Sequence, residues 1–288
     1  MKTIQKTTIA LAASSVFATA TYAQTAPAPA PEVSPITANV TVVNDYRYRG
    51  LTQSNYKPAI QGGFDYAHES GFYIGNWNSS ISWIADGYQG TNTSAPIEMD
   101  FYAGIKKELI GEGFATDFGF LQYYYPIANL PNNSSTASVA SSTGRQGNGV
   151  NPNTTEAYIA QNFTFGPVTG YAKFSYALTN LFGIYNSSGS YYPDLTMNYD
   201  TGVLGLSLNA HVGYQYISNN KPGYDYSYTD WKLGVTKDFG GGLSGSLAYV
   251  GTNAGKVGAT YLYAAPATPT GSKSQGKGGA LVALTKTF

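Results

Sequence analysis

The chain has 288 residues, with 16 Lys and Arg against 16 Asp and Glu, 26 Tyr, 34 Gly and no Cys. This charge balance argues against a nucleic-acid-binding protein, which usually carries a strongly basic patch, and an exported chain without Cys cannot rely on disulfides. Abundant Tyr and Gly with few charged residues are typical of a transmembrane barrel, in which only every second strand residue is apolar. A secreted β-sandwich shares much of this composition and stays open at this point.

The first residues have the order of a secretory signal peptide. A short basic stretch, a brief apolar run and small residues ending at Ala23 follow one another. Residues 1–23 are therefore expected to be cleaved, and residues 24–36, rich in Pro and Ala, to form an extended periplasmic leader. Residues 37–288 are then expected to form the mature domain, located in the bacterial outer membrane.

Alternation of apolar and polar residues after position 36 predicts strands, since a period of two is not helical. The longest run of this kind lies between Leu204 and Tyr216, and Tyr46 and Tyr48 share the apolar parity of Val42. The sequence predicts an antiparallel transmembrane β-barrel of about twelve strands, an even number that suits a bacterial barrel. In segment 154–165, either set of alternating residues could face outward. The expected strands are 37–48, 58–69, 71–84, 96–108, 114–125, 154–165, 168–180, 192–201, 203–217, 228–239, 243–253 and 279–288.

The connections between these strands alternate between short and long. The short ones, such as 166–167 and 240–242, hold Gly or Pro, and the longest is the Ser- and Asn-rich stretch 126–153. Transmembrane barrels have tight periplasmic turns and longer outer loops, so the alternation favours a barrel over a sandwich. The sequence leaves open whether 126–153 folds into the barrel.

The last expected strand carries apolar residues on one face and ends in Phe288. Lys286 lies near enough to this end to reach lipid headgroups. An aromatic residue at the end of such a strand resembles the signal that the outer-membrane assembly machinery recognises. The segment around Trp231 and Phe239 repeats the design. Phe239 and Phe288 are expected to anchor the barrel at the inner interface, with Lys286 reaching the headgroups, and Trp231 is expected to be a membrane anchor on the same face as Phe239.

Charged residues of the polar parity are expected to face the lumen. The candidate lumen-lining residues are Asp45, Arg47, Arg49, Glu98, Asp100, Lys106, Asp117, Lys173, His211, Asp230 and Lys232, with Asp238 at the rim. Opposed charges at one height select small polar solutes in open pores, but in a narrow barrel they also pair and plug the interior. Tyrosines 123–125 are assigned to the outer aromatic girdle, because neighbouring strand residues point to opposite faces.

The sequence gives little support for an enzyme. His68 lies at a predicted turn, and a lumen hydrogen bond accounts for His211. Neither a metal-ligand spacing nor a phosphate-binding loop is present, so we expect no cofactor and no metal. The expected partners are outer-membrane lipids, the assembly machinery and small polar solutes. A homo-oligomer stays open, because strands that face a partner copy and strands that face lipid look alike.

Seven stretches spread along the chain carry a family resemblance. They are 44–50 (NDYRYRG), 57–66 (KPAIQGGFDY), 68–75 (HESGFYIG), 123–126 (YYYP), 211–214 (HVGY), 230–235 (DWKLGV) and 285–288 (TKTF). They resemble the TorF porin family of proteobacterial outer-membrane proteins. The resemblance implies a channel-like outer-membrane barrel and no particular solute. We therefore expect a porin-like channel for passive diffusion of small polar solutes. The alternative is an occluded structural or adhesive barrel.

Overall fold

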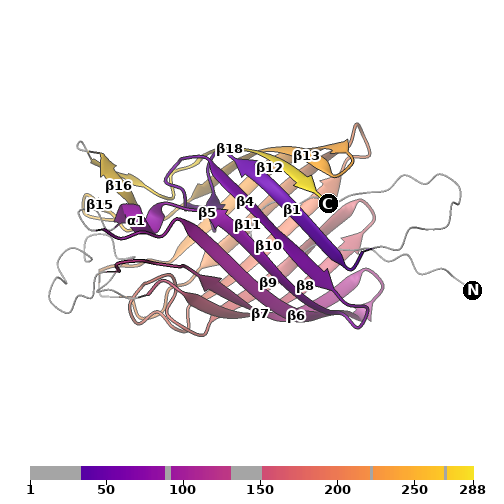
Figure 1. Ribbon diagram of the computed structural model, residues 1–288, viewed down its shortest axis with the longest axis horizontal. Coiled ribbons are helices and arrows are strands. Elements are labelled where there is room, and N and C mark those ends of the chain that lie inside the picture. The colour runs from indigo at the N-terminus through magenta and orange to yellow at the C-terminus, as the bar shows by residue number, and fades with distance from the viewer. Residues whose placement is uncertain (1–33, 88–91, 131–150, 221–222, 269–270) are drawn as a thin grey trace, which may run out of the picture.

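The structure is a computed structural model that describes residues 34–87, 92–130, 151–220, 223–268 and 271–288. The expected signal peptide, most of the leader and most of the loop 126–153 lie outside the described residues. The described residues form a closed antiparallel barrel of twelve strands (Figure 1), which confirms the predicted fold and strand number. Among these residues no helix is long and apolar enough to cross a membrane.

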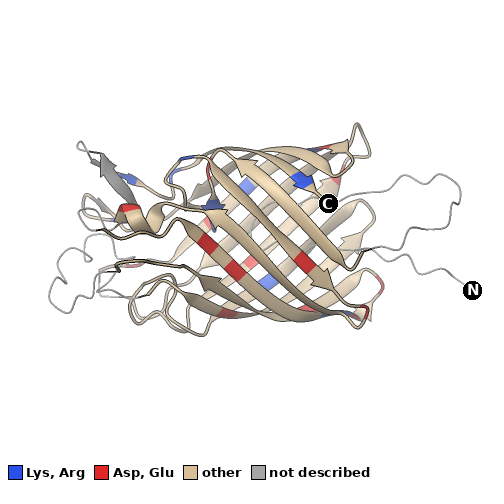
Figure 2. Ribbon diagram, viewed as in Figure 1, with Lys and Arg blue, Asp and Glu red and all other residues tan. Residues whose placement is uncertain are grey.

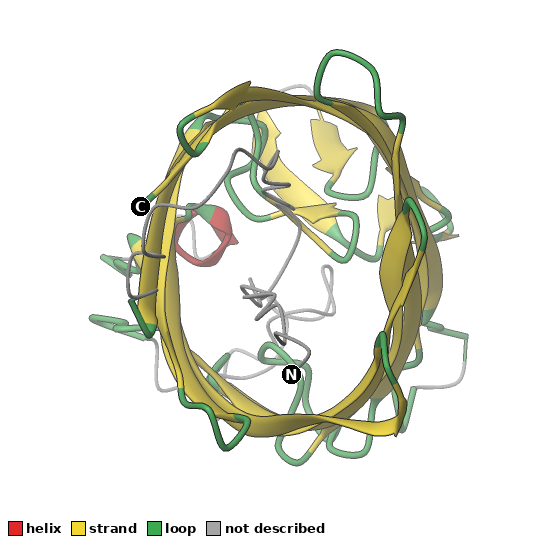
Figure 3. Ribbon diagram, turned by 90° about the vertical axis from the view of Figure 1, so that its right-hand side faces the viewer, coloured by secondary structure: helices red, strands yellow, loops and turns green. Residues whose placement is uncertain are grey.

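The wall of the barrel is formed by strands that each pair with their neighbours in sequence. They are β1 (Ile36–Val43), β4 (Ala59–Ala67), β5 (Phe72–Ser80), β6 (Ile97–Gly111), β7 (Phe114–Tyr124), β8 (Thr154–Phe165), β9 (Val168–Ala177), β10 (Tyr191–Asp200), β11 (Leu206–Gln215), β12 (Tyr228–Gly240), β13 (Leu243–Thr252) and β18 (Gly279–Thr287). The ring closes because β1 pairs with both β4 and β18 (Figure 3). Each wall residue therefore has a fixed register.

The short elements all lie in the long connections. They are β2 (Arg47–Tyr48), β3 (Leu51–Thr52), α1 (Trp83–Gly87), β14 (Lys256–Val257), β15 (Thr260–Tyr261), β16 (Ala264–Thr268) and β17 (Gly271–Ser274). Figure 1 shows α1, β15 and β16 at one end of the barrel, and the tight turns with the last residue at the other. We call these the outer and the inner end. Long and short connections thus lie at opposite ends, as predicted.

The wall strands alternate apolar residues outside with polar residues inside. On β11, Leu208 and Val212 are exposed while Asn209 is buried. On β8, whose orientation the sequence left open, Glu156 is buried and Ile159 is exposed. Successive strand residues point to opposite faces of the sheet, so the exterior of the closed barrel carries an apolar band of the kind that contacts a bilayer.

Interior tyrosines lie across glycines of the neighbouring strands, which accounts for the abundance of both. A Cβ atom added to Gly213 would lie 2.0 Å from the Tyr192 hydroxyl, and one added to Gly104 would lie 2.3 Å from the Tyr73 hydroxyl. The same arrangement pairs Gly119 with Tyr158 and Gly75 with Tyr102. Interiors are close-packed, and each glycine leaves the space that a tyrosine ring occupies.

The first strand is shorter than predicted. It ends at Val43, and the chain then turns into the barrel instead of extending the wall. Arg49 and Gly50 have φ values of 44° and 76° and form the turn of the β2–β3 hairpin; Gly adopts this left-handed region without strain. Tyr46 and Tyr48, predicted on the outer face, are buried inside.

Candidate functional site

Residues 44–58, which connect β1 to β4, enter the outer half of the lumen; we call them the lumen loop. The Asp45 carboxylate accepts hydrogen bonds from three side chains of this loop, those of Arg47, Thr52 and Ser54. Arg47 also donates to the backbone carbonyl of Lys277 at 3.0 Å. Charge-assisted hydrogen bonds are stronger than neutral ones. This buried pair therefore holds the loop in shape and ties it to the start of β18.

The side chain of Arg49 reaches across the lumen. Its guanidinium donates to Glu156 Oε2 on β8 at 2.7 Å and to Gln215 Oε1 on β11 at 2.6 Å, and its Cζ lies 4.2 Å from the ring centroid of Tyr192 on β10. In strand order β8 and β10 flank β9, the strand opposite β1. Burial alone lowers the pKa of this hairpin-turn guanidinium, but the Glu156 carboxylate raises it well above its usual value. A positive charge is thus fixed in the outer half of the lumen.

Aromatic side chains pack around the lumen loop. The Tyr48 and Tyr123 hydroxyls are hydrogen-bonded, and both rings meet Phe182 edge-on, with centroids 5.4 and 4.9 Å away. Tyr46 donates to Glu98 on β6 at 2.5 Å. Edge-to-face rings and satisfied hydroxyls stabilise such a cluster. These rings therefore fill much of the outer half of the lumen.

The assignment of tyrosines 123–125 to the outer girdle is wrong for two of the three. Tyr124 is 42% exposed on the exterior, but Tyr123 and Tyr125 are buried inside. Tyr125 donates to Glu98 at 2.7 Å and Tyr123 to Glu156 at 3.2 Å. Their hydroxyls face inward because the acidic acceptors lie there, which alternation alone does not reveal.

The remaining charged candidates lie on the inner wall, and Figure 2 shows acidic and basic positions spread along the wall strands. Asp117 accepts a hydrogen bond from Tyr73 at 2.7 Å, and Lys173 lies 4.3 Å from the ring centroid of Tyr158. The buried candidates are Asp45, Arg47, Glu98, Asp100, Asp117 and Asp230, and the half-buried ones are Arg49, Lys106, Lys173, His211 and Lys232. Asp238 lies at the inner end and accepts from the Gly240 amide at 2.7 Å.

His211 forms a network with its neighbours on the wall. Its Nε2 lies 3.2 Å from Asp230 Oδ1 and 3.0 Å from the Tyr192 hydroxyl, and its Nδ1 lies 2.8 Å from the Thr196 hydroxyl. The order hydroxyl, imidazole, carboxylate is that of a nucleophile triad. Thr196 is only 1% exposed, however, so a substrate cannot reach its hydroxyl. The network instead holds Tyr192 beneath Arg49.

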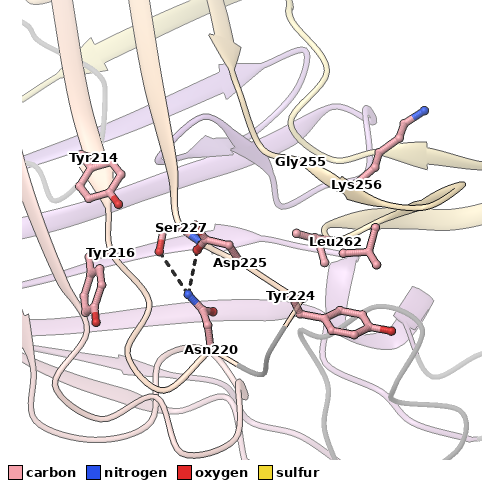
Figure 4. Close-up of a pocket in the computed structure, with 11 residues that line it drawn as sticks. Tyr214, Tyr216, Asn220, Tyr224, Asp225, Ser227, Gly255, Lys256 and Leu262 are labelled. Atoms are coloured by element: carbon pink, nitrogen blue, oxygen red, sulfur yellow. Dashed lines mark hydrogen bonds between the residues drawn. The ribbon is translucent and has the colours of Figure 1, made fainter.

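One cavity lies inside the barrel, and another lies at its outer rim. The interior one, about 50 Å³, lies between the lumen loop and β12, β13 and β18, and its polar lining includes Arg47 and Lys232. It has room for a few water molecules. The other is an open cleft of about 520 Å³ at the outer rim, lined in part by Tyr216, Tyr224 and Lys256 (Figure 4). The interior cavity is the one that the wall strands and the lumen loop line together.

The expected membrane anchors lie at the exterior of the barrel. Trp231, Phe239 and Phe288 are 41%, 58% and 73% exposed. Phe288 continues the pairing of β18 with β1, since its amide donates to the Ala38 carbonyl at 2.9 Å. Lys286 donates to the backbone carbonyl of Gly241 in the adjacent tight turn. This lysine is thereby held at the inner rim.

A sealed barrel with an apolar exterior and a charged interior defines the class of transmembrane β-barrels. The chain belongs to the bacterial family described as "Bacterial protein of unknown function (Gcw_chp)", whose model matches residues 26–288. No curated protein matches the chain.

Several solved porins are similar in fold. The KdgM porin is 6% identical with a TM-score of 0.48, and the alignment covers 88% of this chain and 98% of that one. The NanC porin is 8% identical with a TM-score of 0.49, and the alignment covers 87% of this chain and 98% of that one. Pseudomonas aeruginosa OprD is 11% identical with a TM-score of 0.38, and the alignment covers 90% of this chain and 67% of that one. Such low identities carry no function from those porins to this chain.

Proposed function

We propose that this protein is an outer-membrane, porin-like channel for the passive diffusion of small polar solutes. The observation that carries the proposal is that adjacent wall residues alternate between charged side chains inside and apolar side chains outside. Asp117 and Lys173 point inside, while Phe118 and Phe174, the next residues, are exposed outside. Buried charges are costly in a dry interior, whereas residues that line a water-filled lumen tune its selectivity.

The lumen loop is the constriction of the proposed channel. It places Arg49 opposite Glu156 and fills much of the outer half with aromatic rings. The polar cavity beside it, between Arg47 and Lys232, is the proposed route past the loop. A fixed positive charge at a narrow point would admit small solutes and discriminate among them by charge.

An occluded structural or adhesive barrel is the second candidate. The packing of Tyr48, Tyr123 and Phe182 across the outer half favours it, since well-packed rings leave no room for a solute. An enzyme is a weaker candidate, because the triad-like group of His211 is enclosed around Thr196.

The proposal extends to export and assembly. We infer that residues 1–23 direct export, that the assembly machinery inserts the barrel among outer-membrane lipids, and that the resemblance to the TorF porins reflects a shared role. The exposed apolar band supports the membrane location. It would equally serve contact with a second copy in a homo-oligomer.

Planar-bilayer recording on the purified chain tests the channel. We expect single-channel steps of defined size from the wild type. A variant in which residues 46–54 are replaced by a short Gly-Ser linker should conduct more, because the constriction is gone. Folding is checked by heat-dependent gel mobility. A folded wild type that is silent while the shortened variant conducts would support the occluded barrel, and silence of both would refute a channel.

A further inference from the structure

One row of neighbouring residues on the inner wall carries charges of alternating sign. Lys106 on β6 is paired in register with Asp117 on β7, and Lys173 on β9 with Asp194 on β10. Ala160 on β8 joins the two pairs, since it faces both Asp117 and Lys173. Directly paired residues have Cβ atoms about 5 Å apart. The four charges therefore form one continuous row.

The row climbs from the inner end of the barrel towards the outer end. Asp117 is the fourth residue of β7 counted from a tight turn, whereas Asp194 is the fourth residue of β10 counted from a long connection. Strands tilt in a closed barrel, so a line of paired residues winds obliquely along the axis. Gly213, the next residue of the row, faces both Asp194 and Asp230. The row therefore leads to the network below Arg49.

The charges of this row are neighbours without forming ion pairs. The Lys106 ammonium and one oxygen of Asp117 have no hydrogen-bond partner among the described residues, and neither has one oxygen of Asp194. That Asp194 oxygen lies 3.9 Å from His211 Nδ1. Lys173 lies over the ring of Tyr158. Leaving buried charges uncompensated destabilises a fold, so purely structural charges would be expected to pair. These atoms are enclosed in this conformation, and a solute that enters the row would supply the partners that the protein does not.

We propose that the row of Lys106, Asp117, Lys173 and Asp194 is the path of zwitterionic, amino-acid-like solutes that carry one ammonium and one carboxylate. This inference rests on the proposed channel. A zwitterion matches an adjacent cation and anion at once, and it finds the same match at the next pair. A singly charged solute meets a repelling group beside each attracting one, and a neutral solute gains nothing from either charge. The row thus selects solutes by the pattern of their charges rather than by their net charge.

Liposomes that contain the full chain test this selectivity. Uptake of L-threonine is compared with that of erythritol, an uncharged molecule of similar size. We expect the wild type to favour threonine. Lys173→Gln or Asp194→Asn should each lower the threonine-to-erythritol ratio roughly tenfold, the factor that corresponds to about 1.4 kcal/mol. The exchange of Lys173→Asp with Asp194→Lys keeps one cation beside one anion and should restore most of the ratio.

Lys107→Gln is the matched control, because this neighbour of Lys106 is exposed on the other face of β6. Its ratio should equal that of the wild type. Asp117→Asn probes the second pair, so the test does not depend on the folding of one variant. Equal uptake of both solutes by the wild type, or an unchanged ratio in the folded neutralised variants, would overturn the role of the row and leave the proposed channel intact. A folded wild type that passes neither solute would overturn both.

Discussion

The guanidinium of Arg49 bonds the carboxylate of Glu156 at 2.7 Å across the interior of the barrel. One residue belongs to the lumen loop after β1, and the other lies on the opposite side of the closed sheet. Removal of one member of a buried charge pair leaves the other uncompensated, which is strongly destabilising. The Arg49–Glu156 ion pair therefore holds the lumen loop in place across the passage.

Replacing Arg49 should release the lumen loop from the opposite wall of the barrel. For Arg49→Gln we expect larger single-channel conductance and a shift of selectivity towards cations, because Glu156 keeps its negative charge. Neutralising Arg47 as well should extend the shift. Reversal potentials in a KCl gradient measure the selectivity. Lys57→Gln is the control, since this side chain of the same loop is 65% exposed. Unchanged selectivity of a folded Arg49→Gln barrel would remove this residue from the passage.

Gly213→Ala should destabilise the barrel. The added methyl group would meet the Tyr192 hydroxyl at 2.0 Å, and overpacking of this kind costs about 1–3 kcal/mol. The free energy of unfolding is measured by urea titration in lipid vesicles. Ala210→Val adds bulk to the exterior of the same strand and should change it little. Equal effects of the two variants would contradict close packing of Tyr192 on Gly213.

A charge placed on the exterior of the wall tests the membrane contact. Leu208 is 50% exposed on β11, and Leu208→Arg should reduce the free energy of unfolding by about 2–4 kcal/mol if this residue lies near the bilayer midplane. Leu204→Arg, in the adjacent tight turn, should have an effect near zero. Urea titration in vesicles compares the two. A small effect at Leu208 would show that this face does not meet lipid.

Phe288→Ala should slow assembly into the outer membrane. The residue is expected to serve both as a lipid anchor and as the signal for the assembly machinery. Phe165→Ala is a matched control, because this exposed aromatic lies beside another tight turn at the inner end and has only the anchoring role. Pulse-chase conversion to the heat-modifiable form measures the rate. Equal rates for the two variants would leave no signal function at Phe288.

The sequence by itself determined the barrel. Along β11, Leu208, Ala210 and Val212 alternate with polar residues, and in a strand the face of each side chain depends only on whether its position is odd or even. The strand number and the two ends follow from the same alternation and from the lengths of the turns. This information is local, so it can be extracted without knowledge of contacts.

The tertiary structure alone decided how the lumen is filled. Tyr46 and Tyr48 continue the apolar parity of β1, yet they turn inside to meet Glu98 and Tyr123, which come from other strands. The nesting of Tyr192 on Gly213 likewise depends on the register of β10 and β11. The energy of such contacts comes from partners distant in sequence, whose placement exists only once the barrel closes.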